Sequence, residues 1–135
     1  MRKYIFAFAL IFLSGMANGL HETITYHYQS FLGWFPSADP EYWDPAQSWT
    51  AKYRNHDPEQ GPSFFGSTTI FVAFTDAKHA TDALRRSALI LGMFILGYYY
   101  RELKHRHHFL VIAAATASVW LFQGLGFHIV YSLFF

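Results

Sequence analysis

The sequence contains no cysteine, and only 14% of its 135 residues are charged. The absence of cysteine excludes disulfide bonds, thiolate chemistry and zinc sites built on cysteine. Soluble domains usually carry about 25% charged residues, so the low charge content already sets this chain apart from them. The net charge is +1 and no long block of like charge occurs, so the sequence predicts no nucleic-acid partner.

Catalytic fingerprints are missing as well. The sequence has no G-x-S-x-G nucleophile elbow, no Walker lysine loop, no G-x-G-x-x-G dinucleotide fingerprint and no H-E-x-x-H zinc helix. The adjacent His21 and Glu22 lack a second histidine at the spacing that a zinc helix requires. No motif therefore names a reaction.

Apolar residues are abundant instead, because 53% of the chain is hydrophobic and 21% is aromatic. A chain of this length has room for one domain, and a small soluble domain buries only a limited fraction of its surface. A lipid bilayer can cover the excess. We therefore predict an all-α fold, in which residues 1–135 form a single membrane domain built as a helical bundle of three, or four, transmembrane helices.

The hydrophobic pattern places transmembrane helices at about 4–22 and 109–133 and a long helix at about 67–101, which Ser67 or Thr68 would cap. The segment at about 33–66 holds all five prolines and three of the four tryptophans. Frequent proline excludes a continuous helix, and tryptophan suits the headgroup region. This segment is predicted to be an aromatic, proline-rich loop at the membrane surface.

The basic residues set a predicted orientation. Arg2 and Lys3 precede the first apolar run, and a cluster of basic residues follows Tyr100. By the positive-inside rule the N-terminus is cytoplasmic, and the loop at 33–66 and the C-terminus lie outside. Residues 1–17 also fit a signal peptide, with a basic start, a short apolar core and a small-residue exit. Both interpretations of this segment stay open.

Small residues and one ion pair bear on how the helices pack. Gly15 and Gly19, like Ala113 and Ala117, have the spacing that lets another helix approach closely. The apolar run from Ser87 to Tyr100 covers about 21 Å of helix, less than a hydrocarbon core of about 30 Å. A span of full length must therefore include the charged residues Asp82, Arg85 and Arg86 upstream of Ser87. An ion pair between Asp82 and these arginines on one helix face would ease their burial.

Five polar residues converge on one predicted level. Counting about 1.5 Å per residue from each predicted cytoplasmic end puts them about 27 to 37 Å up, near the outer boundary. They are Glu22, His27, Asp76, His79 and His128. Asp76 and His79 share a helix face, whereas Glu22 and His27 lie about 140° apart on an ideal helix and could cooperate only if that helix bends.

Imidazole and carboxylate groups are ligands for zinc and other divalent metals. We predict a metal site formed by His27, Asp76, His79, Glu22 and His128, with Glu22 and Asp76 as catalytic carboxylates that activate a bound water. The alternative for each residue is structural. A lone histidine often sits among lipid headgroups, and Asp76 could cap its helix or pair with a nearby basic residue.

The segment from Phe64 to Thr69, followed by Thr75-Asp76-Ala77-Lys78-His79, resembles a group of small, uncharacterised integral membrane proteins of Bacteroidota-like bacteria. The resemblance covers roughly residues 15 to 80 and carries an F-x-G-S-T-T motif followed by T-D-x-x-H. It implies a location in the bacterial inner membrane. It also implies roles for Glu22 and His27, because the group has an acidic residue five before a histidine at the end of the first helix. It implies no particular reaction.

The predicted metal site makes a metal-dependent hydrolase of a lipid or lipid-linked substrate at the outer boundary the first of three functions, and the one that we predict. The second is a non-enzymatic accessory or structural subunit of a larger membrane complex, with a membrane-protein partner or further copies of this chain as neighbours. The third is a transporter or channel component, in which Asp82, Arg85 and Arg86 line a polar path and oligomers are required.

Overall fold

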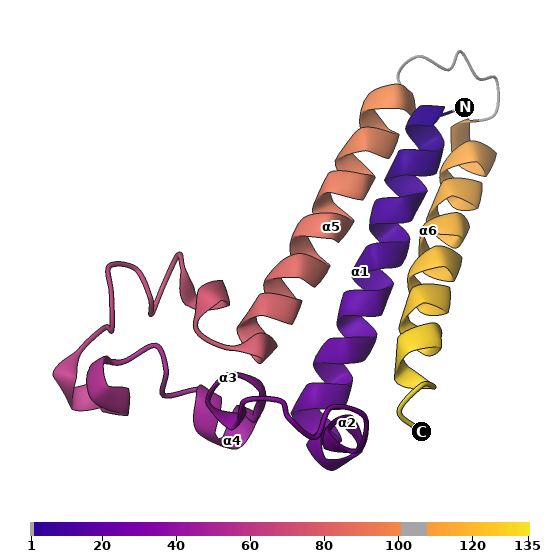
Figure 1. Cartoon of the computed structure of the whole chain (residues 1–135). Coiled ribbons are helices and arrows are strands. Elements are labelled where there is room, and N and C mark those ends of the chain that lie inside the picture. Colours follow the sequence, from indigo (N-terminus) through magenta and orange to yellow (C-terminus); the bar gives the residue numbers. More distant parts are fainter. Residues whose placement is uncertain (1, 101–107) are drawn as a thin grey trace.

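The computed structural model describes residues 2–100 and 108–135, and within these ranges the chain is helical and contains no β-strand. The long helices are α1 (Arg2–Tyr26), α5 (Ala77–Tyr100) and α6 (His108–Tyr131). Figure 1 shows α1 between α5 and α6. Both outer helices pack along α1 rather than on each other. The all-α prediction is confirmed, and the three long helices form one open layer, called here the three-helix layer.

The segment between α1 and α5 consists of turns and short helices. Three of the short helices begin with an aspartate N-cap followed by a proline at the first helical position. This pair of residues favours the start of a helix at that point. The short helices are α2 (Tyr28–Trp34), α3 (Pro40–Trp43), α4 (Pro45–Ser48), η1 (Arg54–His56), η2 (Pro58–Gln60) and η3 (Val72–Phe74). The predicted lack of a continuous helix over the proline-rich loop is confirmed.

Helix α5 begins at Ala77 and not at residue 67 as predicted. Ser67 is buried, but its hydroxyl donates to the carbonyl oxygen of Lys52 at 2.7 Å instead of capping a helix. Gly66 has a φ of +79°, which turns the chain sharply, and the amide of Phe71 then bonds back to the Gly66 carbonyl. This turn and η3 occupy the chain from Gly66 to Phe74, and Asp76 directly precedes α5.

Glycines bring α6 against α1. A methyl group added to Gly15 would lie 2.0 Å from the carbonyl oxygen of Gln123, and one added to Gly126 would lie 2.3 Å from that of Phe12. Gly19 similarly faces the backbone of Phe127. The close approach predicted at Gly15 and Gly19 is thus confirmed. Backbones come this near only where side chains are missing.

No helix of this chain packs on the other predicted stripe, because Ala113 and Ala117 are both exposed. Helix α6 meets α1 through its second half, where Gly126 permits contact. Along the first half of α6, an apolar groove of about 700 Å³ separates this helix from α5, and Tyr4 and Phe8 of α1 are among the residues that line it. The first half of α6 therefore has no neighbouring backbone for alanines to pack on.

On its other side α1 packs against α5 in the antiparallel sense. Gly92 lies against Ile11 and the carbonyl oxygen of Ala7. Near the opposite end of the pair, the His21 ring contacts the first turns of α5. Ala7 and Ile11 are fully buried in this seam. The register of α5 along α1 is fixed by contacts at both ends.

Two helices are long and apolar enough to cross a membrane, over Tyr4–Tyr26 and Phe109–Tyr131. The prediction was three or four such helices. Within the described residues α5 does not qualify, because Asp82, Arg85 and Arg86 fall inside the length that a span would need. The basic segment 101–107, predicted to form a cytoplasmic turn and to follow a helix that ends at 101, lies outside the described residues.

Replacing Gly126 with alanine is expected to lower the thermal stability of the detergent-purified protein, because the added methyl group would meet the Phe12 carbonyl. Overpacking of this kind costs about 1–3 kcal/mol. Gly124→Ala in the same helix is the matched control, since nothing lies within 4 Å of its added methyl group. Alanine should even favour the helix there, by up to about 1 kcal/mol. Equal unfolding temperatures for the two variants would contradict the contact between α1 and α6.

Candidate functional site

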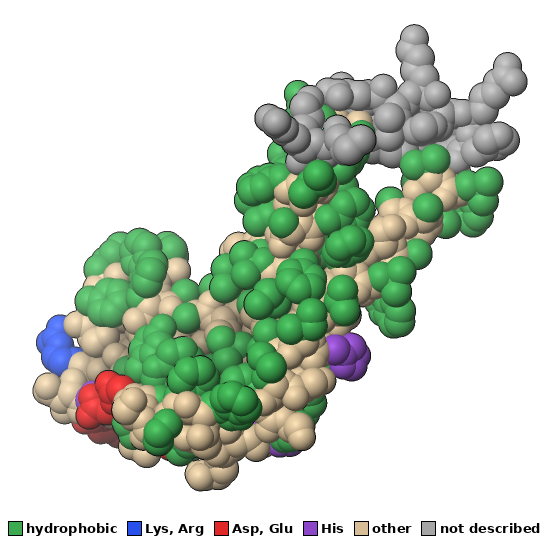
Figure 2. Space-filling model, turned by 45° about the vertical axis from the view of Figure 1, so that its right-hand side comes forward, with side chains coloured by type: hydrophobic (Ala, Val, Ile, Leu, Met, Phe, Trp, Pro, Cys, Tyr) green, Lys and Arg blue, Asp and Glu red, His purple; other side chains and the backbone are tan. Residues whose placement is uncertain are grey.

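The five predicted site residues lie at one end of the three-helix layer. The end of α1, the start of α5 and the end of α6 meet there, together with the short helices α2, α3 and α4 (Figure 1). Figure 2 shows hydrophobic side chains along the long helices, while the acidic and basic side chains visible on that face gather at this end. The five residues therefore share one end of the layer, while the ion pairs of Asp82 with Arg85 and Arg86 lie further along α5.

Asp76 and His79 form the closest pair of the set. The His79 ring contacts the Asp76 carboxylate through Nδ1 at 2.7 Å from Oδ2, and the backbone amide of His79 donates to Oδ1 at 2.8 Å. Thr75 donates its hydroxyl to Oδ2 as well. A carboxylate oxygen accepts, so Nδ1 of the imidazole carries the proton in this contact. The carboxylate fixes both the ring orientation and the tautomer.

This geometry has a structural role. Asp76 directly precedes α5, and its side chain satisfies the free amide of His79 in the first turn, as an N-cap does. This amide contact is the capping role that the sequence left open as the structural alternative. The contact of the His79 ring with the same carboxylate satisfies no backbone group, so capping does not account for it.

The geometry also permits chemistry. Asp76 is 1% exposed, whereas the His79 side chain is 35% exposed. With Nδ1 engaged, Nε2 makes no hydrogen bond to the described residues and points its lone pair away from the dyad. A buried carboxylate that orients an accessible imidazole is the arrangement that general bases and metal-ligating histidines share.

Tyr42 of α3 lies near this dyad and was not identified from the sequence. Its hydroxyl is partly withdrawn from water, and burial first, then the negative charge of Asp76, raises the pKa of Tyr42 above its usual value. The phenol therefore remains protonated at neutral pH and can donate a hydrogen bond. Tyr42 packs on the buried cluster of Ile24, Phe31 and Ala77. No spacing rule connects a loop tyrosine to Asp76, so only the fold reveals it.

His27 has a different partner. It lies at the break between α1 and α2, where its φ of −135° and ψ of 39° depart from helical values. Its Nε2 is 2.9 Å from the hydroxyl of Tyr131 at the end of α6, and its ring makes edge contacts with Tyr131 and Phe135. The bend that cooperation with Glu22 would require is present, but it directs His27 toward α6 and not toward the Asp76–His79 pair.

The remaining two candidates stand apart. Glu22 is half-buried on α1 and forms no hydrogen bond or ion pair with the residues that the structure describes. His128 is exposed on α6, where its ring makes an edge contact with the adjacent Phe127. In residues 2–100 and 108–135, no three His, Asp or Glu side chains group closely enough to hold one metal ion. Of the five predicted residues, the structure brings together Asp76 and His79.

His21 is a residue whose role the sequence did not assign. Its Nδ1 lies 3.2 Å from both the carbonyl oxygen of Lys78 and the hydroxyl of Thr81. A carbonyl oxygen only accepts, so Nδ1 donates to Lys78. This contact ties α1 to the first turn of α5 beside the dyad. The sequence shows that His21 adjoins Glu22, but it does not show that His21 contacts Lys78, which lies 57 residues away.

Comparison of the chain with protein-family models, with curated proteins and with solved structures found no match in any of the three. The site is therefore interpreted from the contacts of its own residues.

Asp76→Ala is expected to destabilise the fold by about 1 kcal/mol, because the first turn of α5 loses its cap. Asp76→Asn should lose less, since an amide oxygen can still accept from the His79 backbone. His128→Ala, at an exposed site, serves as control and should change stability by less than about 0.5 kcal/mol. Thermal unfolding in detergent measures all three, and an alanine variant as stable as the asparagine variant would rule out the capping role.

Proposed function

We propose that this chain is a non-enzymatic accessory subunit that packs into a larger assembly in a membrane. The observation that carries the proposal is the open three-helix layer. Helices α5 and α6 contact α1 and leave their other sides uncovered, and only 6% of the apolar stretch of α6 is buried. A soluble protein would bury such a stretch in its core, whereas lipid and a membrane partner can cover it.

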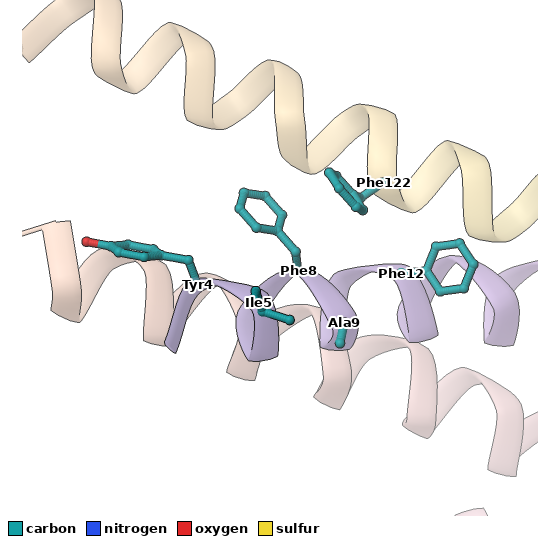
Figure 3. A pocket seen from close by; sticks show the side chains of 6 residues that line it. All are labelled: Tyr4, Ile5, Phe8, Ala9, Phe12 and Phe122. Atoms are coloured by element: carbon teal, nitrogen blue, oxygen red, sulfur yellow. The ribbon is translucent and has the colours of Figure 1, made fainter. Parts of the chain in front are cut away.

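Grooves on the layer support this assignment. Figure 3 shows one of about 450 Å³, where Phe8 of α1 and Phe122 of α6 reach toward each other. Their ring centroids are 4.8 Å apart. The second groove, of about 700 Å³, runs between α5 and α6 over Tyr4 and Phe8. Both are lined mainly by apolar side chains, and such surfaces suit acyl chains or the ridges of another helix.

In this proposal α1, α5 and α6 all cross the bacterial inner membrane, in a multi-pass arrangement with a cytoplasmic N-terminus. Arg2 and Lys3 precede α1, and the sequence between Tyr100 and His108 adds further basic residues. The start of α1, the end of α5 and the start of α6 lie at one end of the layer (Figure 1), which the positive-inside rule assigns to the cytoplasm. The aromatic loop then lies on the outer side. The same proposal includes membership of this chain in the group of small Bacteroidota-like membrane proteins that it resembles.

Helix α1 is proposed to remain in the working protein and not to be removed as a signal peptide. It supplies Ala7, Ile11 and Ser14 to the buried interior. It is also the helix on which both α5 and α6 pack. Removal of α1 at Ala17 would take away Ala7, Ile11 and Gly15 from the surface that joins those two helices, so the packing favours retention.

The second candidate function is the metal-dependent hydrolase, which the contact between Asp76 and His79 favours. His79 would supply Nε2 as a ligand or base, and Asp76 would orient its ring. The described residues provide no third His, Asp or Glu beside this pair, so they do not form a complete zinc site. A zinc ion bound by this chain would need its remaining donors from water, and we assign no reaction step to it.

The accessory-subunit proposal predicts that the chain resists alkaline extraction from membranes. It also predicts that, after mild detergent extraction, the chain migrates in a complex larger than the monomer. Both follow from apolar helices that lipid and a partner must cover. Size-exclusion chromatography with light scattering measures the second. A monodisperse monomer with no co-purifying protein would end the proposal, and extraction by alkali would remove the membrane assignment itself.

The hydrolase candidate predicts that detergent-purified protein binds about one equivalent of zinc, because the imidazole of His79 is pre-oriented. His79→Ala should abolish that binding, and His56→Ala, at an exposed loop histidine, should not. Equilibrium dialysis followed by elemental analysis measures the bound metal. Zinc at background levels in the unaltered protein would dismiss this candidate without affecting the accessory-subunit proposal.

A further inference from the structure

The charged residues of α5 lie beside the middle of an apolar helix. His21 of α1 contacts Lys78 and Thr81 of α5, and Ile11 contacts Gly92. Arg85 and Arg86 lie between these two contacts, so they are level with the middle of the apolar stretch Tyr4–Tyr26. Arg86 is also about 14 Å along the helix from Ala77. If the layer spans a bilayer, as proposed above, this is close to the midplane.

Arg86 does not face the layer. Ala88 is 5% exposed and lies in the seam with α1, and Arg86 is about 160° round the helix from it. The Arg86 side chain is accordingly 69% exposed. Beyond its partner Asp82, the neighbours of Arg86 toward the end of α5 are apolar, with Ile90 68% exposed one turn away. A guanidinium thus projects from α5 among side chains that suit hydrocarbon.

The charges on this face do not balance. Asp82 forms ion pairs with both Arg85 and Arg86, the latter at 2.8 Å from Nε to Oδ2. Two guanidiniums share one carboxylate, so the trio keeps one positive charge. In the described parts of α1 and α6 the only carboxylate is Glu22, which lies toward the outer end. Exposing a net charge to hydrocarbon is costly, and charges at this depth are normally paired.

We propose that the outer face of α5 docks a transmembrane helix of another protein that carries an aspartate or glutamate near its middle. The partner carboxylate would accept hydrogen bonds from the Arg86 guanidinium, and arginine does this well because its planar donors match a carboxylate. A second copy of this chain is a poorer match, since it would bring one net positive trio against another. The inference rests on the membrane assignment and gives the accessory subunit the chemistry of its partner.

The absence of cysteine allows a clean test by disulfide cross-linking. The full chain with Ile90→Cys is placed in phosphatidylcholine vesicles together with a polyleucine transmembrane peptide. The peptide carries one cysteine and a central glutamate, and peptides with central glutamine or leucine are controls. Cross-linking at residue 90 is expected to be about tenfold more efficient with the glutamate peptide than with the leucine peptide. Leu121→Cys on α6, also exposed, should show no such preference.

In the Arg86→Leu variant, cross-linking to the glutamate peptide should fall to the efficiency measured with the leucine peptide. In the Arg86→Lys variant, part of the preference for the glutamate peptide should remain. Equal cross-linking with all three peptides would overturn the inference. So would efficient cross-linking between two copies of the protein through residue 90, or modification of Arg86→Cys by a membrane-impermeant thiol reagent, which would indicate an aqueous path. Flotation of the vesicles after alkaline washing reports insertion separately. A chain that does not insert refutes the membrane assignment, whereas an inserted chain without peptide preference refutes the docking alone.

Discussion

The contact of α1 with two other backbones is the constraint on which the rest of the structure depends. Along one side, Gly15 and Gly19 of α1 meet α6, and along another, Ala7 and Ile11 meet α5 at Gly92. In a bilayer there is no hydrophobic drive to bring helices together, so association relies on close van der Waals contact between small residues. Because α1 uses different sides for its two partners, the outer helices pack on α1 rather than on each other, and a layer results.

This arrangement also determines where the polar residues can meet. The helices α1 and α5 are antiparallel, and α6 returns in the same direction as α1, so the end of α1, the start of α5 and the end of α6 lie together (Figure 1). However, α5 and α6 lie on different sides of α1. Residues on the outer helices are therefore separated by the width of α1, which explains why His27 pairs with Tyr131 while Asp76 pairs with His79.

Local patterns were the part of the structure that the sequence could predict. The small-residue spacing at Gly15 and Gly19 indicated a close helix contact, and the three-residue spacing of Asp76 and His79 indicated a shared face; both are confirmed. The start of α5 could not be found in this way, because the turn at Gly66 depends on a hydrogen bond between Ser67 and Lys52. Depth counting placed five residues at one level but had no information on their direction around each helix.

The two edges of the layer have different chemistry, and this difference is the final argument about function. Helix α6 carries no acidic or basic residue between Phe109 and Phe127, and lipid alone can cover it. Helix α5 presents Arg86 on its outer face and shares a single carboxylate between two guanidiniums. One edge therefore suits hydrocarbon and the other suits protein. In the assembly proposed above, such a subunit would occupy the rim, with α5 turned toward the partner and α6 turned toward the bilayer.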